Sequence, residues 1–87
     1  MTEPIQRQPF TFGFEDVLRM IKEIPGTAIA RSGWNGKDLL VKLQRPDENS
    51  KMTLPYLYIE YPDGKRCPWL ASQTDILAYD WDAFKTN

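Results

Sequence analysis

The first regular pattern of apolar residues predicts an amphipathic helix near the start of the chain. The apolar side chains recur at the spacing of one helical face, at Phe14, Val17, Leu18 and Ile21, with Met20 and Ile24 widening that face. Glu15 and Asp16 lie in the first turn, where they favour the positive end of the helix dipole. Pro25-Gly26 then ends the helix.

The segments that follow predict strands joined by turns. Residues 27–31 are short and partly β-branched, residues 39–44 alternate between apolar and polar, and residues 56–61 alternate again. Between the first two, Asn35-Gly36 is a strong hairpin signal. Residues 45–53 are polar and predict an exposed loop, and Pro62-Asp63-Gly64 suits a tight turn. Residues 65–70 then return as a partner strand, with Pro68 at an edge or bulge.

A second, short helix is predicted near the C-terminus. Ser72-Gln73-Thr74-Asp75 has the form of a capping box, and the helix should run from Ser72 to about Tyr79. The predicted fold class is α+β, with an N-terminal helix packed on a small, mostly antiparallel sheet and a short C-terminal helix. Residues 1–11 are expected to form an extended arm, and residues 12–87 a single domain.

Composition narrows the possible functions. The chain has 87 residues, 11 basic and 12 acidic, with no His and one Cys. An internal disulfide, a structural zinc site and a Ser–His or Cys–His nucleophile are therefore excluded, and neither a metal nor a cofactor is expected. Near-neutral charge argues against long nucleic acid, and the lack of a membrane span or signal peptide predicts a cytoplasmic protein. So small a core favours oligomerisation.

Two clusters centred on tryptophan are candidates for ligand binding. In the first, Trp34 lies in a Gly-flanked turn beside Arg31 and Asn35, where its ring can stack on a base or fold back over the sheet edge. In the second, Trp69 precedes the capping box. The start of the predicted helix can receive a phosphate, although capping explains the same residues.

Other polar residues are weaker candidates for chemistry. Asp80 and Asp82 alternate near the chain end and are expected to be solvated. Cys67 follows two basic residues that can lower the pKa of a thiol, but it lacks a recognisable base and is expected to be inert.

The sequence resembles the second family of phage Thoeris anti-defence proteins in three separated blocks. They are Phe12-Gly13-Phe14 opening the first helix, residues 30–37 (Ala-Arg-Ser-Gly-Trp-Asn-Gly-Lys), and the set Trp69, Ser72, Gln73, Asp75, Asp80 and Trp81. The resemblance spans roughly residues 12 to 82. Residues 45–56 are shorter and more polar than in many members, and the N-terminal arm is longer.

The resemblance implies that the protein sequesters a small nucleotide signal without cleaving it, chiefly glycocyclic ADP-ribose. It implies a homotetramer with pockets between subunits, acting in the cytoplasm of an infected bacterial cell. The ligand-binding residues carried over are Phe12, Arg31, Trp34, Asn35, Trp69, Ser72, Gln73 and Asp75. Within that set the two tryptophans would stack, Arg31 would pair with phosphate and Phe12 would form a wall.

Other functions remain open at this point. Cyclic di- or trinucleotides are alternative ligands. An enzyme that cleaves the signal would have to use Asp75, Asp80 or Cys67. A protein-binding inhibitor of a host defence effector would use exposed aromatic residues, for which Tyr56, Tyr58 and Tyr61 are candidates.

Overall fold

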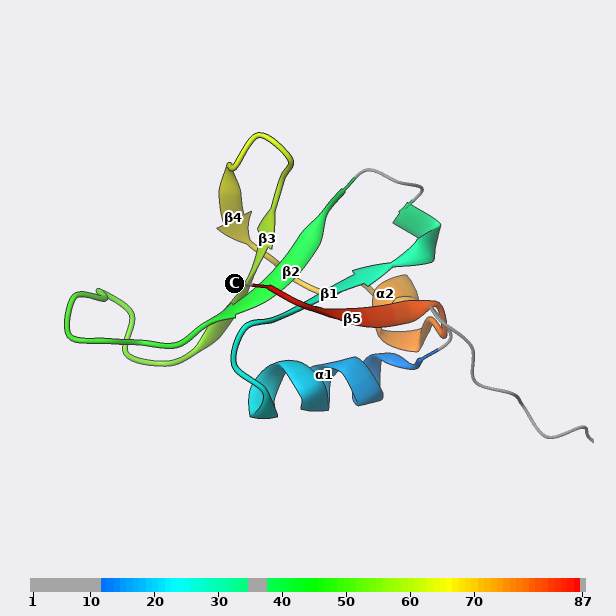
Figure 1. Cartoon of the computed structure of the whole chain (residues 1–87), viewed down its shortest axis with the longest axis horizontal. Coiled ribbons are helices and arrows are strands. Elements are labelled where there is room, and N and C mark those ends of the chain that lie inside the picture. The colour runs from blue at the N-terminus through cyan, green and yellow to red at the C-terminus, as the bar shows by residue number, and fades with distance from the viewer. Residues whose placement is uncertain (1–11, 35–37, 87) are drawn as a thin grey trace, which may run out of the picture.

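The computed structural model describes residues 12–34 and 38–86. In chain order, the elements are α1 (Phe14–Glu23), β1 (Thr27–Arg31), the 3-10 helix η1 (Ser32–Trp34), β2 (Leu40–Gln44), β3 (Tyr56–Glu60), β4 (Arg66–Pro68), α2 (Gln73–Leu77) and β5 (Trp81–Lys85). One helix, a twisted sheet and a short second helix at one end of it make up the fold (Figure 1). The predicted α+β class is confirmed.

The five strands form one antiparallel sheet in the order β4-β3-β2-β1-β5. The first four follow one another as a meander, whereas β5 comes last in sequence and pairs with β1, along the register Arg31↔Trp81 to Thr27↔Lys85. Pro68 lies in the edge strand β4, as its missing N–H requires. Because β5 pairs with β1, residues far apart in the sequence lie side by side there.

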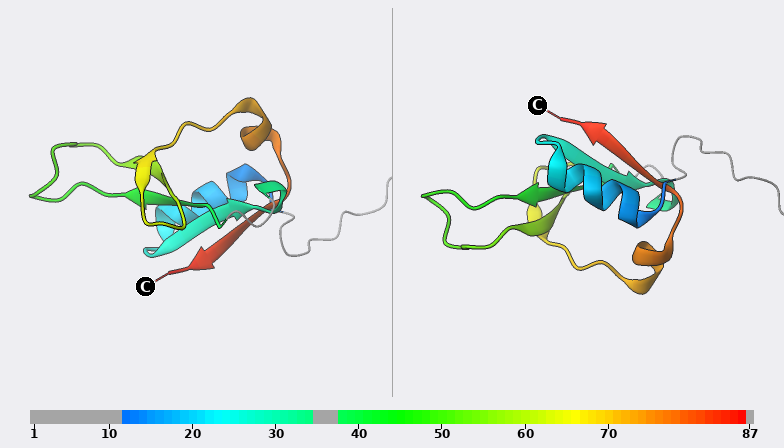
Figure 2. Two further views of the ribbon diagram at one scale, coloured as in Figure 1. Left: turned by 90° about the horizontal axis from the view of Figure 1, so that it is seen from above. Right: turned by 90° about the horizontal axis from the view of Figure 1, so that it is seen from below.

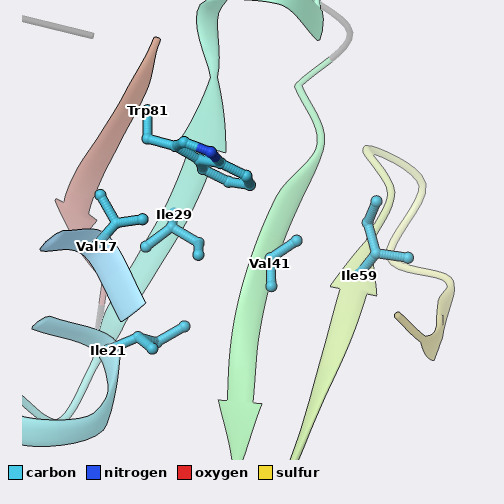
Figure 3. Packing of buried hydrophobic residues seen from close by; sticks show 6 residues of the cluster. All are labelled: Val17, Ile21, Ile29, Val41, Ile59 and Trp81. Carbon is cyan, nitrogen blue, oxygen red and sulfur yellow. The ribbon is translucent and has the colours of Figure 1, made fainter. Parts of the chain in front are cut away.

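Helix α1 covers one face of the sheet (Figure 2). The helix presents Val17 and Ile21, which meet alternate residues of the strands because side chains on a strand point to opposite faces in turn. The fully or nearly fully buried cluster comprises Val17, Ile21, Ile29, Val41, Ile59 and Trp81 (Figure 3). The core therefore draws on α1 and on every strand except β4.

The turns follow the sequence in most places. Gly64 has a φ of 87° and its N–H donates to the Tyr61 carbonyl at 2.9 Å, closing the turn at Pro62-Asp63. The connection from β2 to β3 projects well away from the rest of the molecule (Figure 1). The hairpin from β1 to β2 is also present, although Asn35-Gly36 lies outside the described residues and so does the predicted arm of residues 1–11.

Three expectations need correction. The second helix ends at Leu77 rather than near Tyr79. The segment after it pairs as β5, a strand that the sequence patterns did not predict. Ile24 is 45% exposed, because it follows the end of α1 in an extended conformation instead of continuing the helical face.

Candidate functional site

Three tryptophans and one phenylalanine pack together where β1, β5 and α1 meet, and we call them the tryptophan cluster: Phe14, Trp34, Trp69 and Trp81. Trp81 is fully buried at its centre. Its ring centroid lies 5.4 Å from that of Trp34 and 6.1 Å from that of Trp69, edge-to-face in both cases. Such geometry is favoured by the charge distribution of aromatic rings. The indole N–H of Trp81 donates to the Asp75 carbonyl at 2.9 Å.

Trp34 and Trp69 differ from Trp81 because each is only partly buried. Their centroids are 6.5 Å apart with the rings nearly perpendicular. Trp34 therefore folds back onto the core, which is one of the two alternatives that the sequence left open, and the residue stays partly exposed. The same holds for Trp69, whose backbone N–H is anchored to the Leu57 carbonyl at 3.0 Å.

Next to these rings, one guanidinium is held by two carboxylates, and we call the three residues the arginine bridge: Arg31, Asp75 and Asp80. Arg31 Nε donates to Asp80 Oδ1 at 2.8 Å, and its Nη1 donates to Asp75 Oδ1 at 2.9 Å. The three side chains are 13–28% exposed. The bridge joins the end of β1 to α2 and to the residue before β5, so it ties together segments 44 and 49 residues apart.

Hydrogen bonding sets the protonation of the bridge. Burial alone would raise the pKa of Asp75, but hydrogen bonds from Arg31 and Ser72 outweigh it and hold the pKa below its usual value. Burial also opposes ionisation of Asp80, yet bonds from Arg31 and the Gly33 N–H lower its pKa. The pKa of Arg31 is raised, mainly by its hydrogen bond with Asp80. All three groups are therefore charged at neutral pH, with one negative charge in excess.

The start of α2 shows the predicted capping box. Asp75 N–H donates to Ser72 Oγ at 3.1 Å, and Ser72 N–H donates to Asp75 Oδ2 at 3.1 Å. The capping alternative therefore accounts for both side chains. Gln73 is the first residue of the helix and is exposed.

The structure brings most of the predicted binding residues to one end of the sheet. Phe12 pairs with Trp81 through two backbone hydrogen bonds of 3.1 and 3.2 Å. Arg31 and Asp75 contact each other directly, and Trp34 and Trp69 share the cluster. Ser72 and Gln73 begin the adjacent helix. Asn35 lies outside the described residues.

Asp80 is the residue of this end of the sheet that the sequence patterns misplaced. Asp80 was expected to be solvated, but its carboxylate accepts from Arg31, from the Gly33 N–H at 2.8 Å and from Ser32 Oγ at 3.3 Å. A usable signal was the alternation of Trp81 and Ala83 with polar Asp82, which is typical of a half-buried strand.

The opposite side of the sheet is more open. A hollow of about 450 Å³ is lined by Met52, Thr53, Leu54, Tyr56 and Pro68. A second, of about 210 Å³, lies beside it and is lined by Gln44, Tyr56, Tyr58, Arg66, Cys67 and Pro68. Tyr56 borders both hollows, and the Arg66 guanidinium lies 5.9 Å from the centroid of the Tyr58 ring.

Two further features bear on function. Across residues 12–34 and 38–86, no group of three His, Cys, Asp or Glu side chains is placed to hold a metal ion. Nor does any helix in this part of the chain combine the length and apolar character needed to cross a membrane.

Comparisons with known proteins point to one family. A family model described as the Thoeris anti-defense 2-like domain matches residues 12–84. Thoeris anti-defense 2 of Bacillus phage SP01 is 33% identical over 82 residues, in an alignment that covers 79% of this chain and 90% of that protein. The matched region contains both the tryptophan cluster and the arginine bridge.

Proposed function

The chain belongs to the Thoeris anti-defense 2-like family, and we propose that it counters Thoeris defence by binding and holding a small nucleotide signal, glycocyclic ADP-ribose or a close isomer. A signal that stays bound cannot activate a defence effector. Such a protein needs affinity and no turnover, which agrees with a chain that lacks histidine.

The observation that carries this proposal is the convergence of partly exposed rings and polar groups at one end of the sheet. Trp34 and Trp69 keep part of each ring accessible while their other contacts fix them in the core. Rings held in this way lose little conformational freedom when a flat base stacks on them. Stacking on an aromatic side chain contributes about 1–3 kcal/mol per base.

We assign different roles to the residues of this end. Trp34 and Trp69 stack on the adenine or the adjoining ring, Phe12 borders them, and the exposed side chain of Gln73 reaches polar edges of the ligand. We extend the last role to Asn35 on the motif alone, because it lies outside the described residues. Arg31, Ser72 and Asp75 support these contacts, because their hydrogen bonds to one another already engage them. A phosphate that approaches Arg31 has to compete with two carboxylates.

Isothermal titration with glycocyclic ADP-ribose tests binding, and release tests the lack of turnover. We expect a saturable heat signal, and intact ligand when the complex is heated and the supernatant is analysed by mass spectrometry. Trp34→Ala and Trp69→Ala should each weaken binding, whereas Tyr79→Ala, which removes an exposed ring on the α2–β5 connection, should not. Recovery of a cleaved nucleotide would show an enzyme instead. No binding of this ligand or of cyclic di- and trinucleotides would reject the proposal.

We further propose that the protein acts as a homotetramer. The buried core is small, and large apolar side chains remain exposed, with Leu70 and Leu54 the most exposed among them. Native mass spectrometry should give a particle of four times the 10.1 kDa chain mass. A monomer at micromolar concentration would contradict this part of the proposal alone.

Direct binding to a defence protein is the second candidate function. It is favoured by the apolar hollow around Met52, Leu54 and Tyr56, in which aromatic and methionine side chains gather as they do in protein interfaces. A pull-down of a purified Thoeris effector in the absence of nucleotide separates the two candidates. Retention of the effector supports direct inhibition, and retention only of nucleotide supports sequestration.

A further inference from the structure

We propose that Asp80 is a positioning residue, which clamps the turn of residues 32–34 so that Trp34 is presented to the ligand. This inference rests on the proposed function, because Trp34 is one of the rings assigned to contact the nucleotide. Asp80 itself makes no ligand contact in this proposal.

Asp80 bonds to three consecutive residues through three different atoms. Its backbone carbonyl accepts from the Ser32 N–H at 2.9 Å, and its Oδ1 accepts from Arg31 Nε at 2.8 Å. Its Oδ2 accepts from the Gly33 N–H at 2.8 Å and from Ser32 Oγ at 3.3 Å. The residue that follows this stretch is Trp34, so its backbone starts from a segment that Asp80 fixes.

The other side of the clamp is Trp81, the residue after Asp80. The Trp34 ring packs edge-to-face on Trp81 at 5.4 Å. The Asp80-Trp81 pair therefore holds the turn in two ways. Asp80 bonds to the backbone of the turn, and Trp81 packs against the Trp34 ring. Without the Asp80 contacts, the position of the turn depends on the ring contacts of Trp34 with Trp81 and Trp69.

Gly33 shows how closely the carboxylate approaches the turn. A Cβ atom placed on Gly33 would lie 2.9 Å from Asp80 Oδ2, which is closer than side chains normally tolerate. The absence of a side chain at Gly33 is thus what lets its N–H reach the carboxylate. Gly33 and Asp80 thus make one hydrogen-bonded contact, and either residue can be substituted without changing the Trp34 side chain.

Asp80→Ala and Asp80→Asn test the proposal by titration with glycocyclic ADP-ribose. Asp80→Ala removes every side-chain acceptor and should weaken binding about tenfold or more, because hydrogen bonds to a charged group are the strong ones. Asp80→Asn keeps an oxygen for the Gly33 N–H and should lie between Asp80→Ala and the unaltered protein. The matched control is Asp82→Asn, which removes a carboxylate that, among the described residues, accepts a local bond from the Ala83 N–H at 2.8 Å. It should bind as tightly as the unaltered protein.

Gly33→Ala provides a second test in case Asp80→Ala fails to fold. It retains every charge but forces Oδ2 away from the turn, so it should also weaken binding while the thermal unfolding midpoint stays close to that of the unaltered protein. If Asp80→Ala folds and binds as tightly as the unaltered protein, the proposal is overturned. Normal binding by Gly33→Ala overturns it as well.

The Gly33 amide resonance provides a readout that needs no ligand. In a nitrogen–proton correlation spectrum, the Gly33 N–H shift should follow protonation of Asp80 as the pH is lowered, and this response should vanish in Asp80→Asn but persist in Asp82→Asn. An unresponsive Gly33 amide rejects the clamp even if nucleotide binding is confirmed. A responsive amide in a protein that binds no nucleotide supports the clamp and rejects the proposed function.

Discussion

The tryptophan cluster and the arginine bridge, at the β1–β5 end of the sheet, are held by interlocked contacts, although Leu77 and Tyr79 in and after α2 are exposed. The side formed by β3, β4 and the loop of residues 45–55 instead leaves large apolar side chains in solvent. At the first, Trp81 is fully buried and its N–H is bonded. At the second, Leu54 is 75% exposed and Met52 is 61% exposed. A close ion pair there joins Lys42 of β2 to Glu60 of β3 at 2.7 Å.

This difference suits the two regions to different kinds of binding partner. Groups that recognise a small rigid ligand work best when they are already held in place, because their conformational freedom is lost during folding instead of during binding. Exposed methionine and leucine side chains adapt to a larger partner surface, and a second subunit is the partner proposed above. Four predictions test whether the two regions differ in this way, in decreasing order of expected effect.

Trp81→Ala should be the most damaging single substitution considered. It removes the ring that Phe14, Trp34 and Trp69 all contact and leaves a cavity in the core. We expect the free energy of unfolding to fall by about 3–5 kcal/mol, as measured by urea denaturation. Leu54→Ala is the comparison on the open side and, at a protein concentration low enough to keep the subunits apart, should change it by less than about 0.5 kcal/mol. Similar losses for both variants would contradict the distinction.

Arg31→Met should have the next largest effect. The substitution keeps the length of the side chain but leaves Asp75 and Asp80 facing each other without a cation. Breaking a buried ion pair costs about 3–5 kcal/mol, and the partial exposure of these groups reduces our expectation to about 2 kcal/mol. The control is Arg66→Met, since the Arg66 side chain is 62% exposed. Thermal unfolding of the two variants side by side is the measurement.

The sequence was sufficient to predict the elements whose signals are local. The face of α1, the alternation in β2 and β3, the turn at Pro62-Asp63-Gly64 and the capping box at Ser72 all appear where they were predicted. Each depends on residues within a few positions of one another. Strand β5 was missed because it begins soon after α2 and is stabilised by pairing with β1, a strand far away in the sequence.

The candidate site was predictable in part, for the same reason. The motif blocks named Arg31, Trp34, Trp69 and Asp75, which the structure places together, although spacing alone could not say that they meet. Asp80 was misjudged because nothing near it in sequence is a cation, and its partner Arg31 lies 49 residues away. The sequence also could not show that Trp34 packs on the core, because the ring it packs on belongs to the distant residue Trp81.

Acid should destabilise the protein more through the arginine bridge than through the open side. The pKa values of Asp75, Asp80 and Glu60 are all lowered in the folded state, the last chiefly by its hydrogen bond with Lys42. Their contribution is complete above the pKa of an unfolded carboxyl, about 4, and is lost as the pH falls further through the folded-state values.

Urea denaturation between pH 7 and pH 2.5 checks this expectation. Arg31→Met should remove more of the loss in acid than Lys42→Met, because the arginine serves two carboxylates and the lysine one. Little change is expected from these groups between pH 7 and pH 5. An equal response of the two variants would place the acid sensitivity elsewhere in the chain.

Tyr56→Ser should have the smallest effect, although Tyr56 borders both hollows of the open side. The side chain is 39% exposed and lies on the sheet face that α1 does not cover, so the free energy of unfolding should change by less than about 0.5 kcal/mol. Affinity for glycocyclic ADP-ribose should also stay unchanged, because Tyr56 belongs to the other region. If the variant instead loses the ligand while the Trp34→Ala variant keeps it, nucleotide recognition belongs to the β3–β4 side. The preformed rings at the β1–β5 end are then part of the core alone.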